Sequence, residues 1–355
     1  MKVLLLGEYS SLHNNLKDGL VALGHDVTVA AGADGFKNIP RDIDLDSSLP
    51  SVLGSVHRRV KLFHSLPRMK NFDVVQLVNP FIFYQKGFPA LSYIKKLVAS
   101  NDKFFMLACG DDAYFWRFGR RALRYSPFAD SLKYDLKAES FYMEGDAAFR
   151  FNRSTLNVVR GVIPVMYEYE VSYADAPNRL PTIPIPVNIE KIKYQENQPS
   201  HKLVVFHGLN RYGAKGTKYV EEAFAILEKK YPQDLELVID GKMPLERYLR
   251  LMERTNVVID QTNTYSLGVN GVLALAMGKV VLGGAEQESL TSLGVEASPV
   301  INIEPNAASI VAVVEGLLER RKDIASIGYQ SRKFAEDVHS HVKVASMYVK
   351  TWSNH

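Results

Sequence analysis

The sequence has few of the residues that cross-link secreted proteins, span membranes or hold metal ions. Cys109 is the only cysteine in 355 residues, which excludes an intrachain disulfide and a cysteine-built metal site and favours a reducing compartment. No run of about eighteen apolar residues occurs, so the sequence predicts no membrane-spanning helix. The nine histidines lack the spacing of metal ligands, and we expect no bound metal. The chain opens with a strand-like segment, residues 2–6, rather than a signal-like one, and we expect a cytoplasmic protein.

A dinucleotide fingerprint and internal repeats are missing as well. The segment that follows the first apolar run, residues 6–15, contains no Gly-x-Gly-x-x-Gly pattern. Such a pattern brings a helix N-terminus close to a pyrophosphate. Its absence disfavours a nicotinamide dinucleotide site here.

Short apolar runs alternate with amphipathic segments along the first half of the chain. The predicted strands there are Val3–Leu6, Asp26–Ala30, Val74–Val78 and Phe104–Ala108. This alternation is typical of a parallel sheet wrapped by helices, and the chain is long enough for two domains. A proline-rich passage and a polar stretch place the junction near residues 187–200. We therefore predict one domain over residues 1–187 and a second over residues 188–334.

A glycine-punctuated loop with two cations follows the strand predicted at residues 203–206. Gly208, Gly213 and Gly216 let the backbone approach a ligand, and the cations of the loop are Arg211 and Lys215. Thr217 is placed to open the next helix. Two cations beside a helix N-terminus suit a diphosphate. A surface loop with solvated charges is the alternative, because this pattern alone is a weak signal.

The order of elements in the second half resembles the carboxy-terminal domain of GT-B glycosyltransferases, especially the retaining group called family 4. In that family a strand precedes Gly-Arg, a short loop, Lys-Gly and a helix, and a later Gly-rich helix ends in Ala-x-Gly-Lys-Pro-Val. The matching residues are Arg211, Lys215-Gly216-Thr217, Asp260-Gln261, Gly268 and Ala276-Met-Gly-Lys-Val-Val281. The resemblance implies an α/β fold of two Rossmann-like parallel-sheet domains facing a cleft, with a C-terminal helix of about residues 335–355 crossing back to the first domain.

The resemblance also assigns the donor site. It implies a nucleoside-diphosphate sugar as substrate, no cofactor, and a diphosphate bound by Arg211, Lys215, Gly216 and Thr217. One departure stands out: the family's Glu-x7-Glu pair, which holds the sugar and the ribose, is replaced here by Tyr265 and Leu273. The sugar or nucleotide would then be bound by other groups, for which the candidates are Gly208, Tyr265, Gly268, Val269 and Asn270. Glu286 and Glu288 are further substitutes or, alternatively, solvated loop residues.

Two residues of the first half are candidates for catalysis or acceptor binding. Asp111 follows the strand that ends at Ala108, and GT-B enzymes often carry an Asp near donor and acceptor there. It would bind the acceptor or, in an inverting reaction, act as general base. Alternatively, Asp111 and Asp112 cap a helix. His13 lies in the loop after the first strand, where GT-B enzymes commonly meet the acceptor, although a lone histidine is more often a packing residue.

Positive charge gathers in residues 55–124, which hold thirteen Lys and Arg against four Asp, an excess of +9. Interleaved aromatic residues make this stretch suited to an anionic membrane surface or a lipid-linked acceptor, and peripheral membrane association follows as a prediction. Nucleic acid is the rival electrostatic partner, but no nucleic-acid motif accompanies the charges, and we expect none. Solvated helix faces are the remaining alternative.

The sequence thus predicts a glycosyltransferase that moves a sugar to a hydroxyl of a glycan or lipid-linked acceptor, with retention, in surface polysaccharide or glycolipid synthesis. Because the carboxylate pair is replaced, a non-catalytic nucleotide- or sugar-binding partner with the same fold is the alternative. An epimerase acting on the donor is disfavoured, since that class needs several carboxylates in the cleft.

Overall fold

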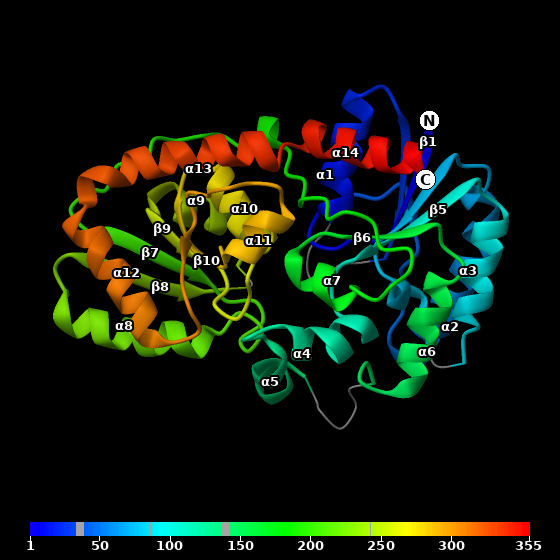
Figure 1. Ribbon diagram of the computed structural model, residues 1–355, viewed down its shortest axis with the longest axis horizontal. Coiled ribbons are helices and arrows are strands. Elements are labelled where there is room, and N and C mark those ends of the chain that lie inside the picture. Colours follow the sequence, from blue (N-terminus) through cyan, green and yellow to red (C-terminus); the bar gives the residue numbers. More distant parts are fainter. Residues whose placement is uncertain (33–38, 86, 137–141, 242) are drawn as a thin grey trace. The chain divides into compact units, whose positions relative to one another are not determined.

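A computed structural model describes residues 1–32, 39–85, 87–136, 142–241 and 243–355. The chain divides into two compact units (Figure 1). Unit 1 comprises Met1–Gly119, Tyr142–Asn188 and His341–His355, and unit 2 comprises Arg120–Phe141 and Ile189–Ser340. The segment Arg120–Phe141, which the sequence analysis placed in the first domain, groups with unit 2 in this division.

Unit 1 is built on a parallel sheet of six strands with the order β3-β2-β1-β4-β5-β6. The strands are β1 Lys2–Leu6, β2 Asp26–Ala31, β3 Ile43–Asp44, β4 Val74–Leu77, β5 Lys103–Ala108 and β6 Gly161–Pro164. Leu4, Leu5 and Leu6 are fully buried, because helices cover both faces of such a sheet. The strand order reverses between β1 and β4, and open α/β sheets bind ligands beyond the carboxyl ends of the strands at such a point.

The helices of unit 1 include one from the far end of the sequence. They are α1 Leu12–Ala22, α2 Ser51–Ser65, α3 Ala90–Ala99, α6 Asp146–Leu156, α7 Tyr167–Ser172 and α14 His341–Asn354, with the short η2 Pro80–Phe83 and η3 Phe115–Gly119. The C-terminal helix α14 lies beside α1 (Figure 1). Gly19 permits this contact, since a Cβ there would lie 2.1 Å from the carbonyl oxygen of His341. Trp352 is fully buried and donates its indole N–H to Gln76 at 3.0 Å.

Unit 2 has a parallel sheet of five strands with the order β11-β10-β9-β7-β8. The strands are β7 Leu203–Gly208, β8 Leu235–Asp240, β9 Val257–Ile259, β10 Val280–Gly283 and β11 Ile301–Asn302. The helices are α4 Arg120–Ala122, α5 Phe128–Asp130, α8 Thr217–Lys230, α9 Leu245–Arg254, α10 Val269–Ala276, α11 Gln287–Ser292, α12 Ala307–Glu319 and α13 Ile324–Val338, with η4 Ser131–Asp135. Strand order reverses between β7 and β9, so the expected ligand position lies beyond their carboxyl ends.

The predicted fold class, two parallel-sheet α/β domains, is confirmed. The predicted C-terminal helical region consists of two helices, of which α13 belongs to unit 2 and α14 to unit 1. Three strands were not predicted: β3 and β11 have two residues each, and β6 begins at Gly161 and ends at Pro164. No helix among the described residues is long and apolar enough to cross a membrane.

Candidate functional site

The loop after β7 brings a lysine to the point where the strand order of unit 2 reverses. Lys215 is only 9% exposed, and its Nζ lies 3.2 Å from Oδ1 of Asp260, the residue that follows β9. Asp260 is itself 1% exposed. The predicted cation is therefore at the expected sheet edge, but it already has an anionic partner within the chain.

Asp260 also contacts the first turn of α10. Its Oδ2 accepts a hydrogen bond of 2.8 Å from the amide of Gly268, so the carboxylate lies at the positive end of the helix dipole. Gly271 makes room for it, since a Cβ there would lie 2.7 Å from the same oxygen. Val269 and Asn270 are half-buried beside Gly268, and α10 begins at Val269. Lys215, Asp260 and the α10 N-terminus thus form one connected group.

A left-handed glycine and a buried histidine hold the start of α8. Gly216 has φ +66, and a Cβ on it would lie 2.0 Å from Thr262 Oγ1, so only glycine fits. Thr217 begins α8 as predicted and is fully buried, with Oγ1 2.9 Å from His207 Nε2. His207 Nδ1 lies 2.9 Å from the carbonyl of Ile259 and must donate to it, so Nε2 accepts from Thr217. Burial, with Lys215 nearby, lowers the pKa of His207 to about 4.

A second carboxylate binds the backbone of the same loop. Asp135, at the end of η4, accepts hydrogen bonds from the amides of Gly213 at 3.0 Å and Ala214 at 2.7 Å. Asp130 binds Lys218 Nζ at 2.7 Å. Two consecutive amides that converge on one carboxylate form the arrangement that binds phosphate in other proteins. The backbone of Gly213, which was expected to approach a ligand, is thus bonded to the chain's own acidic side chain.

The other residues predicted for the donor site differ in exposure. Gly208 and Arg211 are half-buried at the end of β7 and in the loop after it. Tyr265 is 2% exposed, its hydroxyl accepts from the amide of Arg124 at 2.8 Å, and its ring lies 4.8 Å from that of Tyr125. The side chain of Tyr265 is thus part of the packing between the 120–136 segment and the rest of unit 2.

Glu286 belongs to this same packing. It accepts from Tyr125 at 2.6 Å and from Asn302 at 2.9 Å, and it pairs with Arg124 at 2.8 Å. It is therefore not a solvated loop residue.

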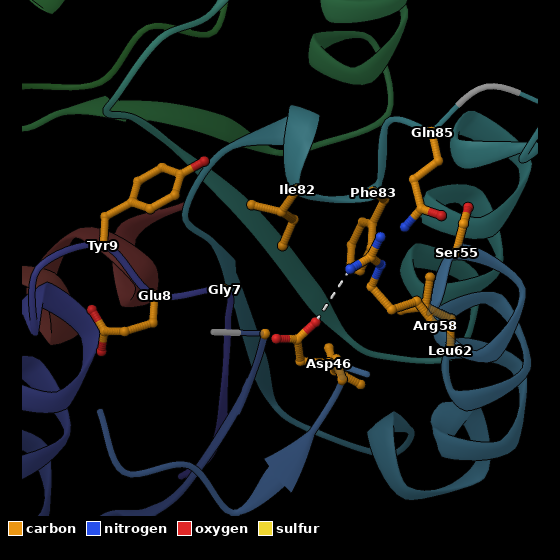
Figure 2. A pocket seen from close by; sticks show the side chains of 12 residues that line it. Gly7, Glu8, Tyr9, Asp46, Ser55, Arg58, Leu62, Ile82, Phe83 and Gln85 are labelled. Atoms are coloured by element: carbon orange, nitrogen blue, oxygen red, sulfur yellow. Dashed lines mark ion pairs between the residues drawn. The ribbon is translucent and has the colours of Figure 1, made fainter. Parts of the chain in front are cut away.

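Unit 1 has a pocket of about 370 Å³ at its own reversal of strand order. The segments after β1 and β4 line it with Glu8, Tyr9, Ile82, Phe83 and Gln85, and α2 contributes Ser55, Arg58 and Leu62. Asp46, two residues after β3, faces Arg58 with 3.6 Å between Oδ1 and Nη1 (Figure 2). The pocket thus combines both signs of charge, an amide, hydroxyls and aromatic faces, the mixture that binds polyhydroxylated ligands.

The loop after β1 is held in an unusual backbone conformation beside this pocket. Gly7, Ser10 and Ser11 have φ of +83, +53 and +67, and two of these residues carry side chains that make such angles costly. Glu8 stabilises the loop, since its carboxylate accepts from the amides of His13 at 3.3 Å and Asn14 at 2.9 Å. A charged cap from outside the helix therefore determines where α1 begins.

His13 does not lie in a loop, and that prediction is wrong. It is the second residue of α1 and is fully buried, with Nδ1 2.7 Å from the carbonyl of Gly7. Burial lowers its pKa to about 4, so it is neutral at pH 7. Its Nε2 has no hydrogen-bond partner among the described residues. His13 does not line the pocket of Figure 2.

Asp111 and Asp112 have separate roles. Asp111 is half-buried and accepts the indole N–H of Trp116 at 3.0 Å, and it does not line the pocket either. Asp112 is fully buried and accepts from the amide of Phe115 at 2.8 Å and the hydroxyl of Tyr173 at 2.8 Å. Burial raises the pKa of Asp112 to about 7, although both hydrogen bonds oppose the change. The alternative of helix capping therefore describes Asp112 but not Asp111.

Within the described ranges, no group of three or more His, Cys, Asp or Glu side chains is placed to hold an ion.

Solved structures with the same arrangement cover this chain over its whole length. Sucrose-phosphate synthase from Thermosynechococcus elongatus matches 100% of this chain and 98% of its own with a TM-score of 0.67 at 12% identity. Anabaena HepE in complex with UDP and glucose matches 100% of both chains with a TM-score of 0.62 at 16% identity. The chain has the GT-B fold. No protein-family model and no curated protein matches the sequence.

The GT-B fold also occurs in an enzyme of another class. UDP-GlcNAc 2-epimerase from Neisseria meningitidis, bound to UDP-GlcNAc, matches 100% of both chains with a TM-score of 0.56 at 14% identity. Identities this low establish the fold of this chain and leave its chemistry to the residues at the two sheet edges.

Proposed function

We propose that the chain is a glycosyltransferase that moves a sugar from a nucleoside-diphosphate donor, bound by unit 2, to a hydroxyl acceptor bound by unit 1. One observation carries this proposal most directly: the buried Lys215 is fixed against Asp260 and the N-terminus of α10 where the strand order reverses. HepE and the epimerase, which have the same fold, bind UDP or UDP-sugars. Retention and a role in surface glycan or glycolipid synthesis are parts of the proposal that rest on the resemblance to family 4.

Arg211 and Lys215 would stabilise the diphosphate as it leaves, where negative charge develops. The α10 N-terminus, at Gly268, Val269 and Asn270, would supply backbone amides to the same phosphates. In this proposal the diphosphate takes over partners now bonded to Asp135 and Asp260. Donor binding would then include an exchange of a carboxylate for a phosphate.

The acceptor would bind in the pocket of Figure 2, where Glu8, Asp46 and Gln85 offer oxygen acceptors for hydroxyl groups. Asp111 and His13 do not line this pocket and would act from outside it. Asp111, held by the indole of Trp116, remains the proposed general base or acceptor ligand. His13 would act indirectly, through its bond to Gly7.

Arg211 gives the sharpest test of donor binding. Titration calorimetry with UDP, GDP and their glucose conjugates should show a nucleotide affinity about tenfold weaker for Arg211→Ala, because a charged hydrogen bond to phosphate is lost. Arg320→Ala is the matched control, since Arg320 pairs with Asp323 at the surface and should change nothing. Equal affinity of Arg211→Ala and the natural chain would rule out this role.

Asp135 tests the proposed exchange. Asp135→Asn keeps an amide oxygen as acceptor for the two loop amides but removes the negative charge that competes with phosphate. We expect nucleotide affinity to rise several-fold. A fall in affinity would mean that Asp135 orders the loop for binding rather than competing for it.

A second function, nucleotide or sugar binding without catalysis, is favoured by the replaced carboxylate pair, since Tyr265 is packed against Arg124 and Tyr125. NMR of a UDP-glucose mixture with candidate acceptors distinguishes the possibilities. A new glycoside supports transfer, and an altered donor indicates an epimerase. Binding with neither product supports the non-catalytic function.

A further inference from the structure

A single segment of the chain lies across the carboxyl edge of the sheet in unit 2. We call residues 124–135, which belong to this unit, the strap. The strap is hydrogen-bonded to the segments that follow β7, β9 and β10. These bonds join Asp135 to Gly213 and Ala214, Asp130 to Asn263, and Tyr125 to Glu286. Open α/β sheets bind ligands beyond the carboxyl ends of their strands, so the strap occupies the expected ligand position of unit 2.

Two acidic side chains of the strap bind groups that suit a phosphate. Asp135 accepts from two consecutive amides of the loop after β7, at 3.0 and 2.7 Å. Asp130 pairs with Nζ of Lys218 at 2.7 Å, and its other oxygen accepts from the side-chain amide of Asn263 at 3.3 Å. Lys218 lies in the first turn of α8, where the helix dipole favours an anion. Both carboxylates thus have partners that a diphosphate could use.

Gly213 makes room for the strap. A Cβ on Gly213 would lie 2.1 Å from the carbonyl oxygen of Asp130 and 2.8 Å from the amide nitrogen of Ser131. The backbone of Gly213 is outside the left-handed region, so an alanine would suit the loop itself. The backbone of the strap is therefore what excludes a side chain at this position.

The other end of the strap covers a second part of the predicted donor site. The hydroxyl of Tyr125 donates to Glu286 at 2.6 Å, and its ring lies 4.8 Å from that of Tyr265. The amide of Arg124 donates to the hydroxyl of Tyr265 at 2.8 Å. Tyr265 was predicted to bind the sugar or the nucleotide. The strap therefore contacts residues predicted for the diphosphate and a residue predicted for the rest of the donor.

Most of these contacts are polar. Pro127 and Phe128 are the apolar residues of the strap that are buried. Hydrogen bonds and ion pairs with a carboxylate can be exchanged for those with a phosphate, whereas buried apolar area cannot be replaced in this way. The composition of the contacts thus favours exchange with an anionic ligand.

We propose that the strap is an autoinhibitory segment, which competes with a ligand of the phosphate class for the carboxyl edge of unit 2. The ligand binds when the polar contacts of the strap are released together. Its apparent affinity is then its intrinsic affinity multiplied by the fraction of molecules in which this edge is open. The inference holds for any ligand with a diphosphate. That this ligand also carries a sugar rests on the proposed function.

A substitution at one end of the strap tests whether it is released as a unit. Tyr125→Phe removes the hydroxyl bond to Glu286 and keeps the ring beside Tyr265. Without ligand, hydrogen exchange followed by mass spectrometry should be several-fold faster in residues 124–135 and also in the loop of residues 211–217. Calorimetric titration with pyrophosphate and with UDP should show about tenfold tighter binding, because a hydrogen bond to a carboxylate no longer holds the strap in place.

Tyr231→Phe is the matched control. The hydroxyl of Tyr231 donates to Glu315 at 3.0 Å, so this variant loses the same kind of bond elsewhere in unit 2. It should leave the exchange of the strap and the affinity for pyrophosphate unchanged. Gly213→Ala is a second, steric variant, since its Cβ has no room beside the bound strap. It should speed exchange in residues 124–135, and urea unfolding confirms that each variant folds.

Three results would overturn the proposal. Exchange in residues 211–217 and pyrophosphate affinity that are unchanged in Tyr125→Phe would show that the strap is not released as a unit. Weaker binding by Tyr125→Phe would make the strap a permanent wall of the ligand site. No pyrophosphate binding by the natural chain or either strap variant would mean that this edge takes no anion.

The proposed function can fail separately. If Tyr125→Phe binds pyrophosphate more tightly but neither binds UDP-glucose nor transfers its sugar, the strap is supported and the proposed function is contradicted. Sugar transfer by the natural chain, with no change in exchange or affinity in Tyr125→Phe, would contradict the strap alone.

Discussion

The carboxyl edges of the two sheets differ in how the chain fills them. In unit 1 the reversal of strand order opens into a pocket of about 370 Å³, where Asp46 and Arg58 remain solvent-accessible. In unit 2 the corresponding position is neutralised internally, since Asp260 binds Lys215 and Asp135 binds the amides of the Gly-rich loop. A reversal of strand order can thus form an open pocket suited to a neutral ligand, as in unit 1. It can also be occupied by the chain's own carboxylates, which an anionic ligand would have to replace, as in unit 2.

Breaking the pair in unit 2 should have the largest effect on stability. Lys215→Met leaves the carboxylate of Asp260, 1% exposed, without its cation, and we expect a loss of about 3 to 5 kcal/mol in the free energy of unfolding. Urea unfolding measures it. Adding Asp260→Asn removes the uncompensated charge and should recover much of the loss. If Lys215→Met alone lowers the free energy of unfolding by less than about 1 kcal/mol, the Lys215 and Asp260 pair is solvated. The two sheet edges would then not differ in the way described above.

The loops at both sheet edges contain a glycine in the left-handed region. Alanine substitutions of these glycines can separate the cost of backbone strain from the cost of crowding by neighbouring atoms. Gly294 has φ +71 and open space around it, so Gly294→Ala should cost only about 1 to 2 kcal/mol of backbone strain. Gly216→Ala adds a contact of 2.0 Å with Thr262, and Gly7→Ala one of 2.4 Å with Val78. We expect each to cost roughly 1 to 3 kcal/mol more than Gly294→Ala. Equal melting temperatures for all three variants would show that the loops relax freely.

A buried histidine at each edge should make the chain sensitive to acid. Burial lowers the pKa of His13 and of His207 from 6.5 to about 4. A folded-state pKa below the unfolded value means that each stabilisation is present above pH 6.5 and is lost as pH falls toward 4. At pH 5 each histidine should therefore cost about 2 kcal/mol relative to pH 7.

Asparagine substitutions can test this effect at each edge separately. His13→Asn and His207→Asn keep an amide donor near Nδ1 and remove the titration. Urea unfolding at pH 7 and pH 5 should show a smaller pH difference for each variant than for the natural chain. His207→Asn should also cost about 1 kcal/mol at pH 7, because Thr217 loses its partner. An unchanged pH difference in both variants would place the acid sensitivity elsewhere.

The two sheets could be predicted from the sequence because parallel strands that are buried on both faces are continuous apolar runs. Three strands were not predicted. Strands β3 and β11 have only two residues each, and β6 begins with Gly161 and ends with Pro164, so none of them is a continuous apolar run. Lys215 was recognised from its loop, but its partner Asp260 is 45 residues away, and only the pairing of β7 with β9 brings them together. An acidic residue directly after a buried strand was the available signal.

His13 shows a different limit of sequence reasoning. His13 was expected in the loop after the first strand, but α1 begins at Leu12 and includes it. The structure caps α1 with Glu8, across two residues of positive φ that local propensity disfavours. Segments held in such conformations by tertiary contacts cannot be predicted from neighbouring residues, and they gather where ligands bind.

A substitution in the pocket of unit 1 should have the smallest effect of those considered, and it should change only the binding of the acceptor. Asp46→Asn removes a charged acceptor for ligand hydroxyls, and we expect the acceptor KM to rise about tenfold, the equivalent of one charged hydrogen bond. Because the Asp46 and Arg58 pair is solvent-accessible, stability should change by less than about 1 kcal/mol.

Arg41→Ala is the control, since Arg41 pairs with Asp44 near the pocket without lining it. Donor hydrolysis should stay unchanged in both variants, because Asp46 belongs to unit 1 and the donor is expected in unit 2. A parallel fall in donor hydrolysis for Asp46→Asn would mean that the two edges do not divide donor from acceptor.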